Sequence, residues 1–212
     1  MVSTLEQPVV APNARRGASQ AFKQARTAVS DNLRFIGRLV AHPKNVGAIT
    51  PSSKALAKAI AAQIDVNVAG PILELGPGTG VATAALIESG AAPERITCVE
   101  YDPDFAKMVS QRLPGVSVIT GDAFDLGKTL GSHFTEPFIG AISGVPLLNH
   151  SIVRRQQYLK GVLDRLKPGA PCVQFSYGLH FPVAPPPGVT VVQAAFVLLN
   201  LPPARVWVYR RQ

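Results

Sequence analysis

Apolar and polar positions alternate along this chain in two different spacings. From residue 72 onward, short apolar runs are followed by stretches in which apolar residues recur every three or four positions. The short runs predict buried strands, and the longer spacing predicts helices. The expected strands are 72–75, 96–100, 116–121, 138–143, 171–176, 189–199 and 205–210, and the expected helices include one that begins at Val81, one from 103 to 113 and one from 151 to 166.

This rhythm predicts an α/β fold class. Strands that alternate with helices form a mostly parallel sheet with helices on both faces, as in Rossmann-like folds. The last two expected strands are joined only by residues 200–204, which predicts a closing hairpin. We therefore expect a mostly parallel, seven-stranded sheet with helices on both faces and a C-terminal antiparallel hairpin.

The first 45 residues follow a different pattern. Residues 1–12 contain prolines and no periodicity, which predicts a disordered leader. From about residue 14 to 42, apolar side chains fall within an arc of roughly 120° of a helical projection, with basic side chains opposite. Proline at 43 ends this helix, because it disfavours helical geometry in the residue before it. The expected organisation is a leader (1–12), an amphipathic basic helix (13–45) and one domain (46–212), whose first helix is capped by a serine before Lys54.

The net charge of +8 is concentrated near the N-terminus. Residues 13–58 hold nine Lys or Arg and one acid, whereas residues 59–212 are nearly neutral. A protein that binds a long polyanion across its core would spread its basic residues more widely, so nucleic acid is not an expected partner. A basic amphipathic helix can lie in the interface of an anionic membrane; an ordinary surface helix packed on the core is the alternative. We expect a monomer that is cytoplasmic and peripheral on the inner face of the cytoplasmic membrane.

Neither cysteine belongs to a metal-binding or redox motif. Cys98 and Cys172 each lie inside an apolar run, which predicts buried free thiols, and no metal site is expected. The N-terminus lacks the pattern of a signal peptide, and the longest apolar run, 189–201, is interrupted by polar residues. That run is too short to span a bilayer, so any membrane contact is expected to be peripheral.

The clearest chemical motif is a glycine-rich turn after the first expected strand, Glu74-Leu75-Gly76-Pro77-Gly78-Thr79-Gly80. Glycines at every second position let the backbone turn tightly and let a ligand lie against it. Dinucleotide folds use Gly-x-Gly-x-x-Gly, so the third glycine comes one residue early here, and Glu74 would repel a pyrophosphate. The turn resembles the first motif of the class I S-adenosylmethionine-dependent methyltransferases, whose cofactor carries an ammonium and a sulfonium and no phosphate.

Further residues at the next strand ends complete the expected cofactor site. Glu100 ends the second strand about twenty residues after the glycines, where an acid can accept hydrogen bonds from ribose hydroxyls. Asp122 follows the third strand and could accept from an adenine amino group, with Phe124 against the ring. The expected cofactor is S-adenosylmethionine, and its predicted binding residues are Glu74, Gly76, Gly78, Thr79, Gly80, Glu100, Tyr101, Asp122, Ala123, Phe124 and Ser143.

From about Leu33 to its end, the chain resembles the bacterial phospholipid N-methyltransferases. The resemblance is carried by residues 45–53 (NVGAITPSS), 74–80 (ELGPGTG), 99–102 (VEYD), 143–148 (SGVPLL) and 201–207 (LPPARVW). The glycine motif alone indicates only the superfamily, and the first and last two stretches are more specific. The resemblance implies successive methylation of phosphatidylethanolamine to phosphatidylcholine, with an N-terminal helix that binds anionic membrane.

The segment after the fourth expected strand bears on the methyl acceptor. Enzymes that methylate the adenine amine, ribosomal RNA dimethylases among them, carry Asn-Leu-Pro-Tyr or a similar sequence there, which bonds the amine and stacks on the flipped base. This chain has Ser143-Gly144-Val145-Pro146-Leu147, without the amide or the aromatic ring. An acyl-bearing substrate therefore fits better than a base. An RNA adenine N6-methyltransferase and a non-catalytic cofactor- or membrane-binding protein remain the alternatives.

Two residues beyond the fifth expected strand are candidates for catalysis. Tyr177 and His180 lie where a proton acceptor or an aromatic wall would assist an amine substrate. The alternative for each is an ordinary loop residue, because alignment of sulfonium, methyl and amine needs no acid or base.

Overall fold

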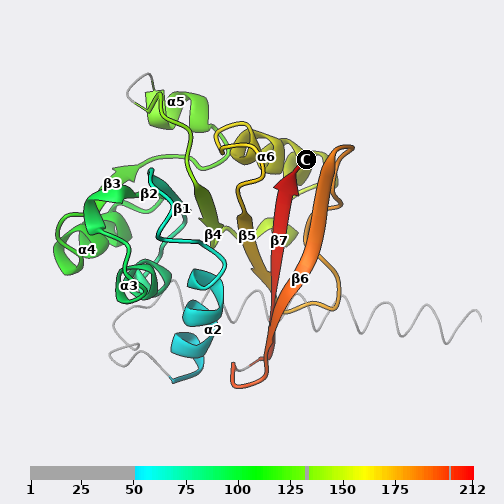
Figure 1. Cartoon of the computed structure of the whole chain (residues 1–212), viewed down its shortest axis with the longest axis horizontal. Coiled ribbons are helices and arrows are strands. Elements are labelled where there is room, and N and C mark those ends of the chain that lie inside the picture. Colours follow the sequence, from blue (N-terminus) through cyan, green and yellow to red (C-terminus); the bar gives the residue numbers. More distant parts are fainter. Residues whose placement is uncertain (1–50, 132–133, 201) are drawn as a thin grey trace, which may run out of the picture. The chain divides into compact units, whose positions relative to one another are not determined.

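The computed structural model describes residues 51–131, 134–200 and 202–212 (Figure 1). The expected leader and amphipathic basic helix, residues 1–45, lie outside the described residues and stay predictions. The described part is the α/β domain.

A seven-stranded sheet with strand order β3-β2-β1-β4-β5-β7-β6 forms the centre of the domain (Figure 1). Its strands are β1 (Ile72–Leu75), β2 (Ile96–Glu100), β3 (Ser117–Thr120), β4 (Gly140–Ser143), β5 (Cys172–Ser176), β6 (Val189–Val197) and β7 (Ala204–Arg211). Strands β1 to β5 are parallel, whereas β7 runs antiparallel to both β5 and β6. The predicted fold class is confirmed, hairpin included.

The helices connect the strands as the periodicity predicts. They are α2 (Pro51–Ala61), α3 (Val81–Glu88), α4 (Pro103–Arg112), α5 (Leu126–Leu130) and α6 (Ile152–Leu163), with 3-10 turns η2 (Pro93–Arg95) and η4 (Leu147–Asn149). The prediction that a serine caps α2 is wrong, because the helix already begins at Pro51, whose fixed φ suits the first helical position. Helix α5 was not predicted, since so short an element shows no periodicity.

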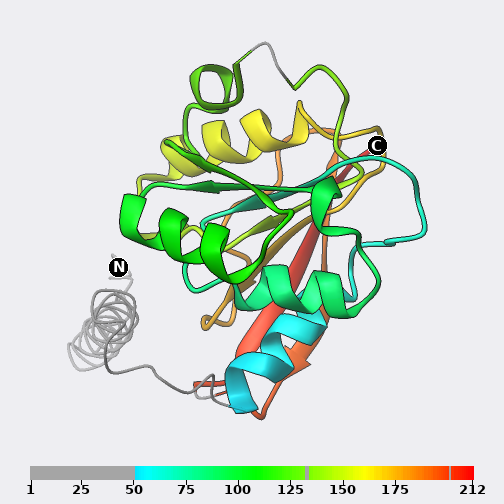
Figure 2. The same ribbon diagram turned by 90° about the vertical axis from the view of Figure 1, so that its left-hand side faces the viewer.

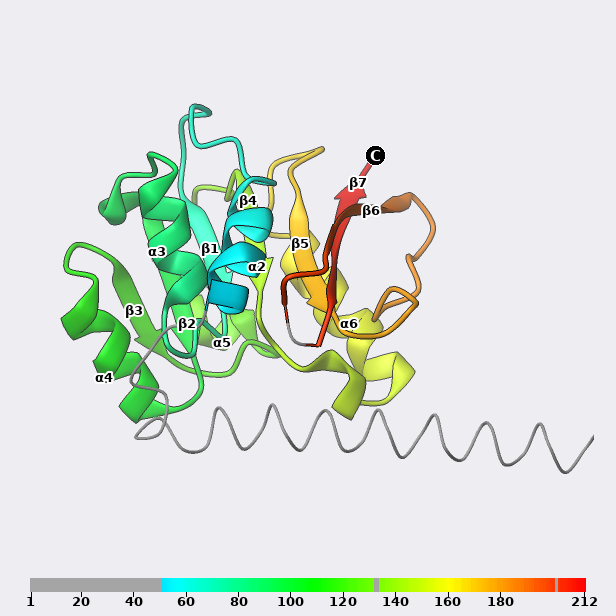
Figure 3. The ribbon, with the colours of Figure 1, turned by 90° about the horizontal axis from the view of Figure 1, so that it is seen from below.

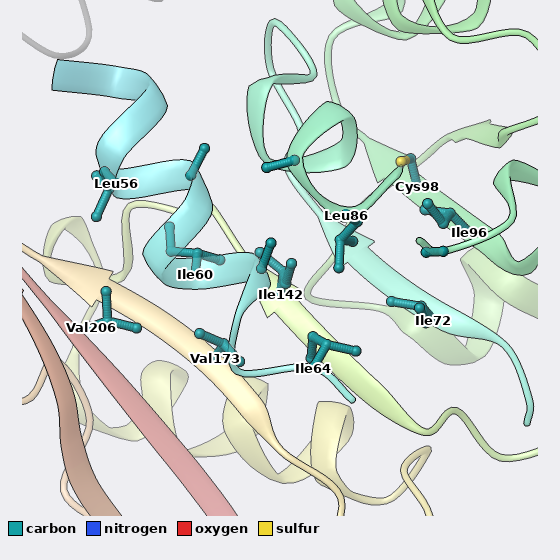
Figure 4. Packing of buried hydrophobic residues seen from close by; sticks show 14 of the residues in the cluster. Leu56, Ile60, Ile64, Ile72, Leu86, Ile96, Cys98, Ile142, Val173 and Val206 are labelled. Atoms are coloured by element: carbon teal, nitrogen blue, oxygen red, sulfur yellow. The ribbon is translucent and has the colours of Figure 1, made fainter. Parts of the chain in front are cut away.

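Helices cover both faces of the sheet (Figure 2), with α6 (yellow) on one side and α2 and α3 (cyan and teal) on the other. Successive residues of a strand point to opposite faces, so the four buried residues of β1 contribute to two cores. The core on the α2 and α3 side includes Leu56, Ile60, Ile72, Leu86, Ile142 and Val206 (Figure 4). The core on the α5 and α6 side includes Leu73, Leu75, Leu126, Leu130, Tyr158 and Val162.

The five parallel strands run in one direction, so their carboxyl ends lie along one edge of the sheet, the edge to which the arrowheads of β3 and β5 point in Figure 3. The turn between β6 and β7 lies at this edge too, because β6 runs in the direction of β5. We call this edge the carboxyl edge; it is formed by residues 76–80, 101–104, 121–125, 144–153, 177–182, 198–200 and 202–203. It is where ligands bind in parallel α/β sheets.

Three further properties concern the described residues alone. Every helix among them is too short or too polar to cross a bilayer. They also hold no group of three or more His, Cys, Asp or Glu placed to bind a metal ion. Cys98 and Cys172 are buried free thiols, as predicted.

Candidate active site

Three glycines shape the turn that follows β1. Gly76, Gly78 and Gly80 have φ values of 69°, 54° and 75°, a left-handed region that other residues rarely adopt. The Gly76 amide donates to the Val99 carbonyl oxygen at 2.8 Å, which fixes the start of the turn against β2. A Cβ at Gly80, the N-cap of α3, would lie 3.2 Å from Leu113 Cδ1. The turn therefore requires glycine for its backbone at all three positions, and at the third a Cβ would also press on the Leu113 side chain.

Glu100, the last residue of β2, is bonded to the glycine turn. Its Oε2 accepts a hydrogen bond from the Gly78 amide at 3.0 Å, and its Oε1 accepts one from the Asp102 amide at 3.1 Å. A carboxylate has about four acceptor sites, so two remain after these bonds. Glu100 is thus held in one place and can still accept two hydroxyl groups, as the predicted ribose contact requires.

Glu74 has a different environment, although it lies only two residues before Gly76. It is 2% exposed, and its Oε2 accepts a hydrogen bond from Thr83 Oγ1 of α3 at 2.7 Å. The Cys98 thiol lies 3.9 Å from the same oxygen. Burial raises the pKa of Glu74 to about 7, despite the opposing effect of the Thr83 hydrogen bond. The structure places this carboxyl group between β1 and α3, and a direct contact with the cofactor stays a prediction.

Asp122 and Phe124 lie together after β3. Asp122 Oδ1 accepts a hydrogen bond from the Phe124 amide at 2.8 Å, which fixes the loop. The centroid of the Phe124 ring lies 4.5 Å from that of His150 and 4.9 Å from that of Tyr158. The Arg154 guanidinium stands 4.6 Å from the Phe124 centroid, a distance suited to a cation–π interaction. An aromatic surface therefore lies beside Asp122, and α6 supports it.

The end of β4 is packed tightly against the glycine turn. Ser143 is fully buried, and its Oγ lies 2.6 Å from the Tyr158 hydroxyl, whose pKa is raised by burial. The next residue, Gly144, donates its amide to the Leu75 carbonyl oxygen at 2.8 Å. A Cβ at Gly144 would collide with the Gly76 carbonyl oxygen. The Ser143 hydroxyl is thus bonded within the domain, and Gly144 lets two strand ends approach closely.

The remaining predicted cofactor residues lie along the same edge. Thr79 is partly buried, and its carbonyl oxygen accepts a hydrogen bond from Arg112 Nη1 at 2.9 Å. Tyr101 is 78% exposed, and Ala123 is partly buried in the loop after β3. The structure brings the predicted set together at the carboxyl edge, except that the side chains of Glu74 and Ser143 are bonded inside the domain.

The two predicted catalytic residues have different surroundings. Tyr177 packs against the core on the α2 side, with its ring centroid 5.8 Å from that of Phe175. Burial raises the pKa of the Tyr177 hydroxyl, so this group is neutral at pH 7. His180 is exposed, and its carbonyl oxygen accepts a hydrogen bond from Ser176 Oγ at 3.4 Å. A catalytic role for either stays a prediction.

The sequence did not single out two side chains near the end of β4. His150 follows η4, and burial together with the Arg154 and Arg155 charges lowers its pKa, so it is neutral at pH 7. Gln174 of β5 is buried, and its Nε2 donates to the Val145 carbonyl oxygen at 3.2 Å, which fixes the turn after β4. Neither belongs to a motif; only the position of His150 after an expected strand end could have marked it.

Comparison with known proteins gives several partial relatives. A family model described as ribosomal RNA adenine dimethylase matches residues 52–132. Ornithine lipid N-methyltransferase of Singulisphaera acidiphila is 29% identical over 122 residues, which are 56% of this chain and 64% of that protein. Ribosomal RNA small subunit methyltransferase A of Myxococcus xanthus is 39% identical over 67 residues, 31% of this chain and 23% of that protein. The chain thus spans less than two thirds of the length of these curated relatives.

A solved structure of another protein has a similar fold. The N-methyltransferase NodS from Bradyrhizobium japonicum, in complex with S-adenosyl-l-homocysteine, has a TM-score of 0.61 and 16% identity, covering 84% of this chain and 97% of NodS. The chain has the fold of the class I S-adenosylmethionine-dependent methyltransferases, as predicted. The predicted cofactor agrees with the S-adenosyl-l-homocysteine bound by NodS.

These comparisons do not identify the methyl acceptor of this chain. The curated relatives include one lipid methyltransferase and one ribosomal RNA methyltransferase. The prediction that nucleic acid is not a partner is therefore unsupported by them, and the predicted phospholipid type is narrower than what they establish.

Proposed function

We propose that this protein is a phospholipid N-methyltransferase. It binds S-adenosylmethionine at the glycine turn, residues 76–80, and transfers methyl groups successively to the amine of phosphatidylethanolamine, towards phosphatidylcholine. Glu100 accepts the ribose hydroxyls, and Asp122 with Phe124 takes the adenine. The position of these residues at the carboxyl ends of β1, β2 and β3 supports this placement of the cofactor.

The observation that carries the choice of acceptor is the turn after β4. In place of the amide and aromatic ring of adenine dimethylases, this turn has Val145, Pro146 and Leu147. Leu147 is buried, Val145 is partly buried and Pro146 is exposed, so the turn presents apolar groups. The match to the ribosomal RNA dimethylase model ends at residue 132, before β4, and therefore covers only the cofactor side. A relative that methylates a lipid amine gives further support.

The chemistry of the acceptor sets what the site must do. An ethanolamine amine has a pKa near that of lysine, about 10, so its neutral nucleophilic form costs about 4 kcal/mol at pH 7. Apolar surroundings lower that pKa, and the Tyr177 ring favours methylated cations by cation–π attraction. His180, exposed on the same connection, is proposed to pass the released proton to water. Alignment of the reacting groups supplies most of the rate.

The proposal also includes a location and a membrane contact. The enzyme is a peripheral monomer on the inner face of the cytoplasmic membrane, attached through the basic amphipathic helix of residues 13–45. Each base near an anionic surface contributes about 1 kcal/mol, so a few bases give reversible attachment.

The test is transfer of labelled methyl from S-adenosylmethionine into phosphatidylethanolamine, using the purified full chain and vesicles that contain phosphatidylglycerol. We expect label in the methylated lipid products. In Glu100→Gln we expect cofactor affinity to fall about 10-fold or more by calorimetry, because a hydrogen bond to a charged group contributes about 1.5–3 kcal/mol. Label in added ornithine lipid alone would show that ornithine lipid, and not phosphatidylethanolamine, is the acceptor. No label in either lipid would refute the proposal of a lipid methyltransferase.

Ribosomal RNA adenine methylation is the second candidate. It is favoured by the family-model match over residues 52–132 and by the Myxococcus xanthus relative. The same assay with ribosomal RNA in place of vesicles distinguishes the two. Label in RNA, with steep salt dependence and none in vesicles, would select this candidate. Cofactor binding without transfer to lipid or RNA would indicate a non-catalytic protein.

A further inference from the structure

Exposed apolar side chains gather at the carboxyl edge. Of the eleven large apolar side chains that are exposed among the described residues, nine lie at this edge or at the adjoining end of β6. The two exceptions are Val68, in the loop before β1, and Val192, within β6. Single exposed apolar residues are ordinary, whereas a cluster of them marks a surface that contacts something apolar.

Apart from Tyr101, which follows β2, the most exposed members come from three segments. Leu198 and Leu199 of the β6–β7 turn are 70% and 81% exposed, and Leu179 of the β5–β6 connection is 73% exposed. Arg205 joins these two segments: its Nη1 donates to the Gly178 carbonyl oxygen at 3.2 Å, and its guanidinium lies 4.5 Å from the centroid of the Phe196 ring. The third segment is the first turn of α6, where Ile152 and Val153 are more than half exposed.

The β6–β7 turn is built to present its leucines. Asn200 is buried, and its Nδ2 donates to the Pro202 carbonyl oxygen at 2.8 Å. The Asn200 amide also donates to the Val197 carbonyl oxygen at 3.4 Å and closes the turn. The Asn200 side chain thus points inward while Leu198 and Leu199 point outward. In a turn that faces only water, polar side chains would be exposed and leucines would not.

The same part of the edge carries positive charge. Downstream of α5 the chain has only two acids, Glu136 and Asp164, and both lie toward the opposite edge of the sheet, before β4 and after α6. Arg154 and Arg155 in the first turn of α6 and Arg205 at the start of β7 lie next to the carboxyl edge. The segments that carry these apolar side chains contain no acid, and Asp122 lies near His150 on the cofactor side. Apolar side chains beside several bases match an anionic lipid surface.

We propose that this apolar face, residues 148–153, 178–181 and 196–199, docks on an anionic phospholipid bilayer, with Leu198 and Leu199 inserted among the acyl chains. The inference rests on the proposed function, because a headgroup amine reaches the cofactor edge from the bilayer surface. Docking through this face brings the turn after β4 to the level of the headgroups. The domain itself thus makes a membrane contact, in addition to the one proposed for the basic helix of residues 13–45.

A local probe tests the insertion directly. In the full chain, Leu199→Cys is labelled with an environment-sensitive fluorophore; the two native cysteines are buried and stay unlabelled. Val68→Cys is the matched control, since Val68 is also exposed and apolar but lies away from the carboxyl edge. With vesicles containing phosphatidylglycerol, we expect a blue shift and quenching by nitroxide-labelled acyl chains at position 199 and no change at position 68. Equal responses at the two positions, or a response at 199 to ribosomal RNA and none to vesicles, would overturn the proposal.

A second experiment measures how much the two leucines contribute to vesicle binding. Leu198→Ser with Leu199→Ser is expected to lower the vesicle partition coefficient about 10-fold or more, because two apolar side chains leave the acyl region, whereas Val68→Ser binds like the wild type. The double variant should still methylate a water-soluble, short-chain phosphatidylethanolamine. Insertion at position 199 without any methyl transfer to lipid would support docking and refute the proposed function. Methyl transfer to lipid in vesicles without a response at position 199 would support the proposed function and refute docking through this face.

Discussion

Glu74 and Glu100 show how the immediate partners of a carboxyl group decide its behaviour. Both are buried, and both lie near the ends of adjacent parallel strands. Glu100 accepts hydrogen bonds from two backbone amides in the loops of the carboxyl edge, whereas Glu74 accepts from the Thr83 hydroxyl of α3. For Glu74 the loss of water outweighs its hydrogen bonds, and the pKa of this group rises.

The raised pKa of Glu74 predicts a pH dependence of stability. The pKa is about 7 in the folded protein against 4.5 for the free group, so between these values the folded state holds a proton that the unfolded state has lost. The stability from this group is therefore complete below pH 4.5 and is lost as pH rises through 7. Relative to Glu74→Gln, the wild type should lose on the order of 2 kcal/mol of unfolding free energy between about pH 5 and 8, measured by urea denaturation. Parallel pH profiles of the two proteins would contradict this.

At the scale of elements, the sequence predicted where strands and turns lie along the chain better than which side chains bond to one another. The strands and the glycine turn were predictable because hydrophobic period and glycine spacing are local properties. Strand β6 was predicted to run to Leu199 but ends at Val197, because the apolar run continues into the β6–β7 turn. The partner of Glu74 comes from α3 and that of Ser143 from α6, and a one-dimensional pattern does not indicate which helix meets which strand end.

The close approach of β4 to the glycine turn predicts a sensitive position. In Gly144→Ala the new Cβ would meet the Gly76 carbonyl oxygen, which is backbone and cannot move aside. Overpacking of this kind costs about 1–3 kcal/mol, and we expect that loss of unfolding free energy together with weaker cofactor binding. The matched control is Gly161→Ala in α6, where a Cβ meets nothing within 4 Å. There we expect no loss, or a gain of up to about 1 kcal/mol from helix propensity. Denaturant titration and calorimetry measure both, and equal effects at the two glycines would contradict the steric argument.

At the scale of the whole molecule, charge and exposed apolar surface are distributed unevenly. The net charge belongs to residues 13–58, whereas the exposed apolar side chains of the described domain gather at its carboxyl edge. The two proposed membrane contacts, electrostatic attraction through the basic helix and insertion through the apolar face, therefore belong to different parts of the chain. The first acts over about a Debye length and weakens with salt, and the second depends on apolar contact and does not.

The final prediction separates these two contributions. Three bases on the polar side of the expected amphipathic helix are replaced by glutamine in the full chain: Lys23, Arg34 and Arg38. At about 1 kcal/mol each, their loss should weaken binding to vesicles containing phosphatidylglycerol about 100-fold at low ionic strength, and the difference should shrink as salt is added. The control removes the same charge from exposed side chains of the domain: Lys107, Lys128 and Lys160. If the control weakened binding as much as the first variant, net charge and not the basic helix would be responsible. Vesicle sedimentation across a salt series decides between them, because only an interaction confined to residues 13–45 gives a large effect in one variant and a small one in the other.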